Sequence, residues 1–280
     1  MPRFKTALMF MAASLFSLAA LPTHALTIAS WNAKHLGWGE KRNWSQSAQV
    51  IADYDFVAVQ EVHGEDGVKR LISELEQTTS TPWSYVMSRK SVGRGRYTED
   101  YVFLWQEQRV NFDGGAVLYL DPGDVFAREP FAARFSSEDG ALKWTAATVH
   151  IIYGDSKAER IEENSELDEY ANWLIESVSE GTPVLIMGDF NLPPDSRGFN
   201  GLKKTFRPAI TRGATTLSSI DGRFANLYDN IWLSPSQLKR AGWPNLAAGI
   251  DRFPQRLGLT HENARKHVSD HAPVYLRVPR

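Results

Sequence analysis

Carboxylate, amide and imidazole side chains recur in this sequence at the ends of short apolar runs. Polar groups that gather at the ends of packed strands commonly form binding or catalytic sites. Together they could activate water, neutralise charge on a phosphate and move protons, which are the tasks of phosphodiester cleavage. The candidates are Asn32, Glu61, His150, Asp189, Asn191, Asp229, Asp270 and His271.

Taken one at a time, these residues also have ordinary structural explanations. Asn32 could sit in a turn, Glu61 could be a solvated strand end, and His150 could be a hydrogen-bonded core histidine. Asp189 and Asn191 could form a turn before two prolines. The occurrence of all the candidates at the ends of apolar runs is what favours a shared site.

The many oxygen donors in this set predict a site for a hard divalent cation. We expect Glu61 to be the first metal ligand, with Asn32 and Asp270 beside it. Asp189 and Asn191 are two residues apart, so in an extended segment they point to the same side and could hold a metal or orient water and phosphate. Mg²⁺ prefers such ligands, with Mn²⁺ as the alternative. A chain with no cysteine and scattered histidines is unsuited to a dedicated zinc site.

His150 and His271 are the candidate general base and general acid. The unperturbed pKa of histidine lies near neutrality, so either ring can accept or donate a proton there. Which ring has which role stays open.

A fold made mostly of strands must position these residues. Runs rich in β-branched and aromatic residues predict strands at 27–31, 55–60, 100–106, 144–151, 184–188, 230–233 and 274–278. Apolar residues at helical spacing predict a helix over 159–178 and a shorter one over 68–75, whereas 240–265 looks like a loop. Many strands with few helices indicate an α/β fold in which two sheets pack face to face, with helices outside.

Residues 1–25 have the layout of a cleavable signal peptide. Arg3 and Lys5 precede an apolar run, and Thr23 and Ala25 match a cleavage site. The apolar run is shorter than the ~20 residues that a membrane-spanning helix needs. We therefore expect a secreted or periplasmic protein with no membrane attachment after cleavage, and a single catalytic domain at residues 26–280.

The composition of the remaining chain narrows the class of protein. Its 29 basic and 33 acidic residues exclude a strongly basic protein, which weighs mildly against nucleic-acid binding. Bound metal ions can supply local positive charge, so nucleic acid is not excluded. The chain has no cysteine, so its core must hold without disulfides.

In chain order, the candidate residues and their flanking runs resemble the endonuclease/exonuclease/phosphatase superfamily. The matching stretches span residues 28–276 and are SWNAKHLGW, DFVAVQEV, ATVHI, LIMGDFN, YDNIWL and SDHAPV. The resemblance implies a four-layer α/β/β/α sandwich, with two mixed sheets flanked by helices. It also implies metal-dependent hydrolysis of phosphate esters.

Two further stretches, GRGRYTEDYVFLW and DVFAREPFAARFSS, resemble the deoxyribonuclease I branch of that superfamily. This resemblance implies that Glu99 pairs with His150, and Asp229 with His271. Such a carboxylate fixes the tautomer of the ring and favours the imidazolium. The two stretches favour DNA over lipids or inositol phosphates as the substrate.

Several side chains are then expected to contact the nucleic acid. Arg128 is the expected phosphate clamp because its fork can match two phosphate oxygens, with a surface ion pair to the adjacent glutamate as the alternative. By the same resemblance Tyr97 would pack against a sugar or base, and Tyr228 would touch the phosphate. Arg94 and Arg96 form a small basic patch suited to backbone contact. Core packing is the alternative for Tyr97, and a solvated loop for the two arginines.

The sequence also departs from the deoxyribonuclease I pattern. His63 stands where an arginine that enters the DNA groove is expected, which weakens the prediction of tight duplex binding. Asp124 and Glu129 resemble part of a structural Ca²⁺ site, but a second, threonine-rich calcium loop is only loosely echoed at 213–219.

These observations predict a monomeric, exported DNA endonuclease that reads backbone and groove shape with little base preference. A phosphodiesterase or phosphatase acting on RNA, sphingomyelin or phosphoinositides would use the same machinery. A non-catalytic binding module or toxin subunit on the same fold is a third hypothesis, which the presence of every candidate residue disfavours.

Overall fold

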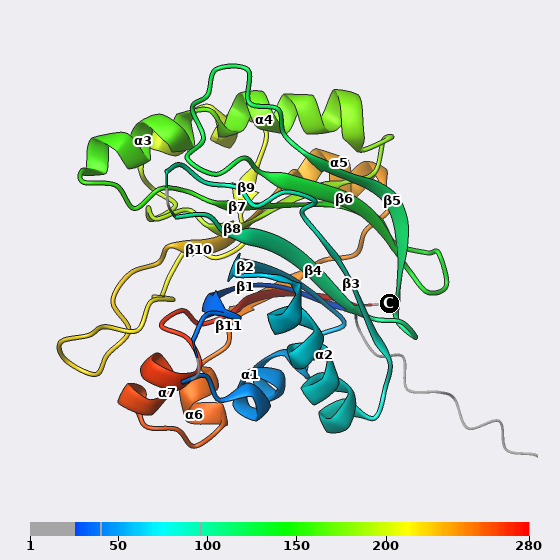
Figure 1. The fold of residues 1–280 in the computed structure, drawn as a ribbon. Coiled ribbons are helices and arrows are strands. Elements are labelled where there is room, and N and C mark those ends of the chain that lie inside the picture. The colour runs from blue at the N-terminus through cyan, green and yellow to red at the C-terminus, as the bar shows by residue number, and fades with distance from the viewer. Residues whose placement is uncertain (1–25, 40, 96, 280) are drawn as a thin grey trace, which may run out of the picture.

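The computed structural model describes residues 26–39, 41–95 and 97–279. Two six-stranded sheets pack face to face, and helices cover the outer faces of both (Figure 1). This arrangement confirms the predicted four-layer sandwich. The expected signal peptide at residues 1–25 and the expected DNA contact Arg96 lie outside the described residues.

The first sheet has the order β11-β12-β1-β2-β4-β3. β1 and β2 are parallel, and the other neighbours are antiparallel. Its strands are β1 (Leu26–Leu36), β2 (Phe56–Val62), β3 (Trp83–Met87), β4 (Asp100–Gln106), β11 (Ala247–Ile250) and β12 (Val274–Val278).

The second sheet has the order β5-β6-β7-β8-β10-β9. Here β7 and β8 form the parallel pair, so each sheet is built around one pair of central parallel strands. Its strands are β5 (Val110–Leu118), β6 (Phe131–Ser137), β7 (Lys143–His150), β8 (Val184–Asp189), β9 (Arg207–Pro208) and β10 (Asp229–Leu233).

Helices form the two outer layers (Figure 1). Those beside the first sheet are α1 (Trp44–Ile51), α2 (Glu65–Thr79), α6 (Phe253–Arg256) and α7 (His261–His267). Those beside the second sheet are α3 (Lys157–Ser165), α4 (Leu167–Trp173) and the π-helical turn η1 (Leu174–Val178), with α5 (Pro235–Arg240) following β10. Two short 3₁₀ turns, η2 (Arg197–Phe199) and η3 (Leu202–Lys204), lie between β8 and β9.

Local sequence explains where several helices begin. The side chains of Asn43, Ser156 and Thr260 accept hydrogen bonds from backbone N–H groups of the first turns of α1, α3 and α7. Each such cap is worth about 1 kcal/mol, because the first N–H groups of a helix otherwise lack partners.

Apolar residues fill three layers of core, one between the sheets and one beneath each helical layer. Between the sheets, the rings of Phe103 and Phe131 stack at 5.2 Å. Gln60 of β2 crosses this layer and donates to the Thr148 hydroxyl of β7 at 2.8 Å. Burial of apolar surface at roughly 25 cal/mol per Å² is what stabilises a chain of this length without disulfides.

A glycine sets the spacing of the central strands of the second sheet. Gly188 has a φ of 147°, and a Cβ on it would lie 1.9 Å from the carbonyl oxygen of Val149. Any other residue would push β8 away from β7 just before Asp189, which lies beside His150.

All seven predicted strands are present, with boundaries that differ by a few residues at β1 and by fewer elsewhere. The single helix predicted over 159–178 is wrong: Glu166, with a ψ of −7°, separates α3 from α4, and the last turn is π-helical. The loop predicted over 240–265 is also wrong, because this segment contains β11, α6 and most of α7. These elements are short, β11 and α6 contain Gly249 and Pro254, and Gly258 follows α6, so no periodic pattern develops.

Candidate active site

The strand ends that the sequence singled out meet at one end of the sandwich. His150 at the end of β7 lies beside Asp189 at the end of β8, and Asp189 is paired with Asp229 at the start of β10. In the first sheet, Asn32 of β1 is paired with Gln60 of β2, the residue before Glu61. The two central parallel pairs therefore present their carboxyl ends to the same place.

Asn32 joins the two halves of the site. Its side-chain nitrogen donates to Oε1 of Glu61 at 3.0 Å and to Oδ2 of Asp189 at 3.2 Å. Its Oδ1 accepts from the backbone nitrogen of Lys34 at 3.0 Å. The Asn32 side chain is fully buried, so this amide fixes the positions of two carboxylates that come from different sheets.

The backbone conformation of Glu61 is unusual. Its φ is 56°, at an irregularity in the pairing of β2 with β4. A left-handed non-glycine residue costs of order 1 kcal/mol or more and is a feature of functional sites. The irregularity turns the Glu61 carboxylate toward Asn32 and toward the backbone nitrogen of His35, which donates to Oε2 at 3.1 Å.

His150 and Glu99 form the first histidine–carboxylate pair, as the sequence predicted. Both carboxylate oxygens of Glu99 lie 2.9 Å from Nδ1 of His150. Nε2 of His150 points the other way, 3.9 Å from Glu61 and 3.7 Å from Asp189. Burial lowers the pKa of His150, but the Glu99 carboxylate outweighs burial and holds the pKa above its ordinary value.

Arg128 supports this pair from behind. Its Nε lies 3.0 Å from Oε2 of Glu99, and its Nη1 donates to the carbonyl oxygen of His150 at 3.1 Å. Its guanidinium also lies over the ring of Tyr97, 5.3 Å from the centroid. Burial raises the pKa of Glu99, yet the charges of His150 and Arg128 keep it below its usual range.

His271 and Asp229 form the second predicted pair. Nδ1 of His271 lies 2.8 Å from Oδ2 of Asp229 and 3.7 Å from Oδ2 of Asp189. Burial lowers the pKa of His271, but these two carboxylates raise it well above the ordinary value. Burial raises the pKa of Asp189, which the positive charge of His271 partly opposes.

Asp189 thus lies between the two histidines. Its Oδ1 accepts from the backbone nitrogen of Asn191 at 2.9 Å, and the Asn191 amide donates to the carbonyl oxygen of Ile151 at 2.8 Å. The arrangement offers one proton-transfer ring on either side of a cluster of oxygen donors. That is the geometry needed to take a proton from water on one side and to return one to a leaving oxygen on the other.

Comparison with known proteins identifies this arrangement. The model of the endonuclease/exonuclease/phosphatase family matches residues 29–271, which include every residue of the cluster described above. The chain belongs to the endonuclease/exonuclease/phosphatase family. This confirms the resemblance drawn from the sequence motifs.

Relatives in the endonuclease/exonuclease/phosphatase family include nucleases. The deoxyribonuclease of Thioalkalivibrio sp. (strain K90mix) is 42% identical over 94% of this chain and 74% of its own length. Deoxyribonuclease-1 of Gallus gallus is 28% identical over 94% of this chain and 94% of its own length. A family member from Leptotrichia buccalis has a TM-score of 0.61 at 14% identity, covering 91% of this chain and 100% of its own. The catalytic domain of human Nocturnin has a TM-score of 0.59 at 16% sequence identity. The match covers 90% of this chain and 93% of the Nocturnin chain. These two solved structures show the fold.

The donor set of this family member fits a hard divalent cation. Ligand atoms of Asp189, Asp229 and His271 all lie within 4.8 Å of one another. Oδ1 of Asp229 is buried, and no described residue gives it a hydrogen bond. Carboxylate oxygens also come from Glu61, beside the Asn32 amide. Carboxylate oxygens together with one imidazole can hold a divalent cation.

Asp270 lies at the edge of this cluster rather than within it. Its Oδ2 is 3.5 Å from Nζ of Lys34 and 3.4 Å from Nη2 of Arg265. A metal bound by Asp270 would have to compete with these two cations. The structure therefore favours Asp229 over Asp270 as the neighbour of Asp189 that faces the cluster.

The expected DNA contacts Tyr97 and His63 lie together beside Glu61. Their rings belong to a partly exposed cluster with His35 and Trp38, with centroids 4.8–6.5 Å apart. Trp38 is 62% exposed. Burial lowers the pKa of His63. At neutral pH the His63 ring therefore presents aromatic surface rather than the positive charge that an arginine would bring.

Tyr228 lies on the opposite side, directly before Asp229. Its backbone carbonyl accepts from the nitrogen of Phe190 at 2.9 Å, which ties it to the segment between Asp189 and Asn191.

Arg94 contacts the surface loop around Asp124 and Phe126. Its Nη2 donates to the carbonyl oxygens of Asp124 and Phe126 and lies 3.3 Å from Oδ1 of Asp124. In the structure the Asp124 carboxylate faces this guanidinium, and the structural Ca²⁺ site near Asp124 and Glu129 stays a prediction.

Glu163 was not predicted as part of the site. This buried residue of α3 accepts from the backbone nitrogens of Ala127 and Ile152, both at 3.0 Å. Those two nitrogens are next to Arg128 and two residues after His150, so one carboxylate holds both segments. Burial raises the pKa of Glu163 to about 7. In the sequence it is one of many acidic residues on a helix, and nothing marks it as buried.

Proposed function

We propose that this protein is a metal-dependent deoxyribonuclease that hydrolyses the phosphodiester backbone of DNA with little sequence preference. One observation carries the proposal: two histidine–carboxylate pairs, Glu99–His150 and Asp229–His271, flank the carboxylate of Asp189. The similarity to deoxyribonucleases along 94% of the chain supports DNA as the substrate.

Different residues of the site would bind the metal and transfer protons. Glu61, Asn32, Asp189 and Asp229 would hold Mg²⁺ or Mn²⁺, which supplies Lewis-acid activation of a phosphate oxygen when bound. One histidine takes a proton from the attacking water, and the other returns a proton to the leaving oxygen. Glu99 and Asp229 each hold their histidine ring in one orientation through Nδ1, which leaves Nε2 free for that transfer.

The substrate side of the site combines charge and aromatic surface. Tyr97 and His63 form an aromatic group, and Tyr228 adjoins Asp229 in the chain. These side chains are the proposed contacts of the DNA strand. Arg128 acts on phosphate mainly through the positive potential it adds behind Glu99 and His150, because its Nε and Nη1 face those two residues.

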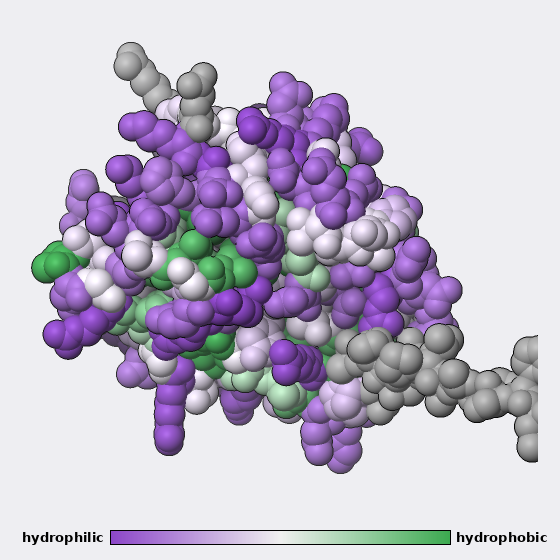
Figure 2. Space-filling model, turned by 90° about the horizontal axis from the view of Figure 1, so that it is seen from below, coloured by the Kyte–Doolittle hydropathy of each residue, from purple (hydrophilic) through white to green (hydrophobic). Residues whose placement is uncertain are grey.

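We further propose that the protein is exported and works as a monomer. The signal-peptide layout of residues 1–25 supports export. None of the helices in the described part of the chain is long and apolar enough to cross a bilayer. The face in Figure 2 is mostly hydrophilic, with apolar areas among the charged residues. Light scattering tests the proposed monomer.

A structural calcium ion near Asp124 and Glu129 is a finer proposal that the contacts of Arg94 oppose. Binding would require the guanidinium to leave the oxygens of Asp124 and Phe126. We therefore propose Mg²⁺ or Mn²⁺ as the required ion and no calcium requirement.

A plasmid-nicking assay with Mg²⁺, Mn²⁺, Ca²⁺ or chelator tests the proposal. Wild type should convert supercoiled DNA with Mg²⁺ or Mn²⁺ and stop with chelator. Glu61→Gln and His150→Ala should lose about 10²-fold or more in rate, whereas Glu169→Gln, at an exposed position on α4, should match wild type. RNA, sphingomyelin and phosphoinositide run in parallel separate the alternatives. Intact plasmid with wild type and Mg²⁺ would refute a deoxyribonuclease.

A further inference from the structure

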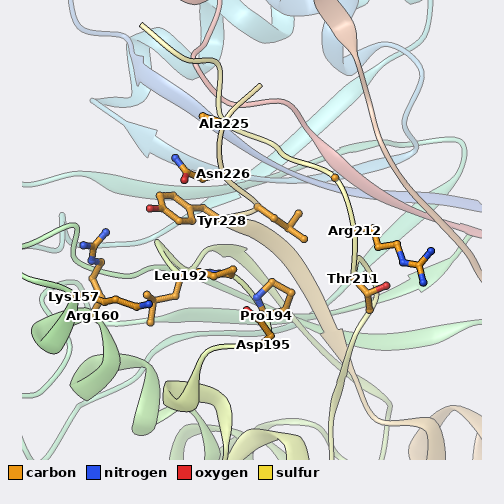
Figure 3. Close-up of a pocket in the computed structure, with 13 residues that line it drawn as sticks. Lys157, Arg160, Leu192, Pro194, Asp195, Thr211, Arg212, Ala225, Asn226 and Tyr228 are labelled. Atoms are coloured by element: carbon orange, nitrogen blue, oxygen red, sulfur yellow. The ribbon is translucent and has the colours of Figure 1, made fainter. Parts of the chain in front are cut away.

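A pocket of about 500 Å³ adjoins the candidate active site (Figure 3). Two of its walls come from segments that carry site residues. Leu192 follows Asn191, and Tyr228 precedes Asp229. The backbone hydrogen bond from Phe190 to Tyr228 joins these two segments. The pocket is therefore formed in part by the segments that carry Asn191 and Asp229.

The ionisable side chains that line the pocket are mostly positive. They are Lys157, Arg160 and Arg212, against the single carboxylate of Asp195. The whole chain carries a formal charge of −2, so this is a local reversal of sign beside an acidic cluster. Guanidinium and ammonium groups in a concave surface, with the neighbouring amide of Asn226, match the oxygens of a phosphate.

Arg160 is held in place but keeps hydrogen-bonding capacity. Its guanidinium lies over the ring of Tyr153, 4.8 Å from the centroid, and interacts with the Tyr228 hydroxyl. Its Nε is buried, and no described residue accepts from it. Burying a donor without a partner is unfavourable, and an acceptor bound in the pocket would remove that cost.

The position of Arg160 is coupled to the active site through Asn164. The Asn164 amide donates to the carbonyl oxygen of Arg160 at 2.7 Å and to that of Phe190 at 3.0 Å. Phe190 lies between Asp189 and Asn191. Figure 3 shows Arg160 beside Tyr228 at one end of the pocket and Arg212 at the other, so a bound chain would pass between two cations.

We propose that this pocket is a second phosphate subsite, which binds a backbone phosphate of the DNA strand next to the phosphate that is cut. The proposal rests on the deoxyribonuclease function proposed above. Arg128 of the active site is already paired with Glu99. The arginines and the lysine of the pocket therefore add positive charge that can pair with a substrate phosphate. It would lower the KM for polymeric DNA and would have no role for a diester with a single phosphorus.

Two substrates separate the subsite from the chemistry. Arg160→Gln and Arg212→Gln are compared with wild type on a duplex oligonucleotide and on bis(p-nitrophenyl) phosphate, which has no neighbouring phosphate. On DNA, each variant should raise KM by about 5- to 20-fold and reduce the slope of log binding constant against log salt by about 1. Turnover of the small diester should stay within about twofold of wild type, because losing one phosphate contact affects only the polymer.

Arg240→Gln is the matched control, since this exposed arginine on α5 does not line the pocket. It should match wild type on both substrates. Arg212 is exposed, so its variant keeps the test usable if Arg160→Gln does not fold.

Each outcome bears on a different claim. Wild-type KM and salt slope in both pocket variants would overturn the subsite and leave the deoxyribonuclease proposal standing. Equal losses on DNA and on the small diester would also overturn it, because Arg160 would then act on the catalytic centre. A wild-type protein that cuts the small diester but no DNA would instead refute the proposed function.

Discussion

Glu99 holds His150 with both carboxylate oxygens, each 2.9 Å from Nδ1 of the ring. The carboxylate is fully buried, and Arg128 is its second partner at 3.0 Å. A buried charge between two cations is stabilised only while both remain, since removing one partner leaves an uncompensated charge. The three residues therefore act as one unit, and substitutions within it should not be additive.

Replacing Glu99 by Gln should move one limb of the pH–activity profile to lower pH. The Glu99 charge is what holds the pKa of His150 above its ordinary value against burial, and without it burial and the Arg128 charge both lower that pKa. We expect turnover to fall about 10- to 10³-fold at neutral pH. Measuring kcat on plasmid or oligonucleotide over a series of pH values gives both the position of the limb and the loss of turnover.

The direction of the change also assigns the role of His150. If the alkaline limb moves, His150 is the general acid; if the acidic limb moves, it is the base. An unchanged profile with unchanged turnover would mean that the Glu99–His150 pair has no part in proton transfer.

Arg128→Lys should reduce both stability and activity although the charge is kept. An ammonium cannot reach Glu99 and the His150 carbonyl in the fork geometry of the guanidinium. We expect the free energy of unfolding in urea to fall by about 1–3 kcal/mol and kcat/KM to fall about tenfold or more. Arg223→Lys is the control, because the exposed Arg223 pairs with Asp221 at the surface, where ion pairs are worth about 1 kcal/mol or less. Equal effects of the two substitutions would contradict the special role of Arg128.

Glu163 should make the protein less stable as the pH rises. Its pKa is about 7 when folded, above the ordinary 4.5, so the folded state holds the proton more tightly. The resulting stabilisation is fully present below pH 4.5 and is lost as the pH rises through about 7. The loss has a limiting slope of about 1.4 kcal/mol per pH unit.

Urea unfolding of Glu163→Gln at about pH 5 and about pH 8 measures this contribution. The variant should be destabilised at both pH values by about 1–3 kcal/mol, since its amide N–H₂ faces a backbone N–H of Ala127 or Ile152. Its disadvantage relative to wild type should shrink at the higher pH. A constant difference at both pH values would rule out titration of Glu163 in this range.

Arg94→Ala should make the protein respond to calcium. In wild type the guanidinium faces the oxygens of Asp124 and Phe126, and the substitution exposes them to the solvent ions. We expect millimolar Ca²⁺ to raise the melting temperature of the variant by a few °C, roughly the effect of 1 kcal/mol of ligand binding, and to leave wild type almost unchanged. A larger calcium response in wild type than in the variant would show that Arg94 does not occupy a cation position.

The sequence predicted the candidate site better than its surroundings. Glu61, His150, Asp189 and His271 each end or adjoin an apolar run, and the ends of the central strands meet at one end of the sandwich, where these side chains form a shared site. The partners could not be placed by pattern alone. The pairings of Glu99 with His150 and of Asp229 with His271 are contacts 51 and 42 residues apart in the chain, and they came from the family resemblance.

What the sequence missed depends on contacts between distant segments. In the sequence, Glu163 looks like any solvated acidic residue on a helix. In the fold, the backbone segments of Ala127 and Ile152 lie against its carboxylate. Asp270 stays a predicted metal ligand, and the ion pairs of its carboxylate with Lys34 and Arg265 are contacts that the sequence did not indicate. The sequence shows which residues are charged, but only the fold shows which charges and backbone groups lie next to each of them.

The Asn32 bridge to Asp189 crosses from one sheet to the other, and so does the contact of His271, just before β12, with Asp229 of β10. Half of the catalytic machinery is therefore fixed to each sheet, and its spacing is set by how the two sheets are rotated against each other. The stacked rings of Phe103 and Phe131, deep between the sheets, help to fix that rotation. A change in such a ring could silence the enzyme while every catalytic side chain remains in place.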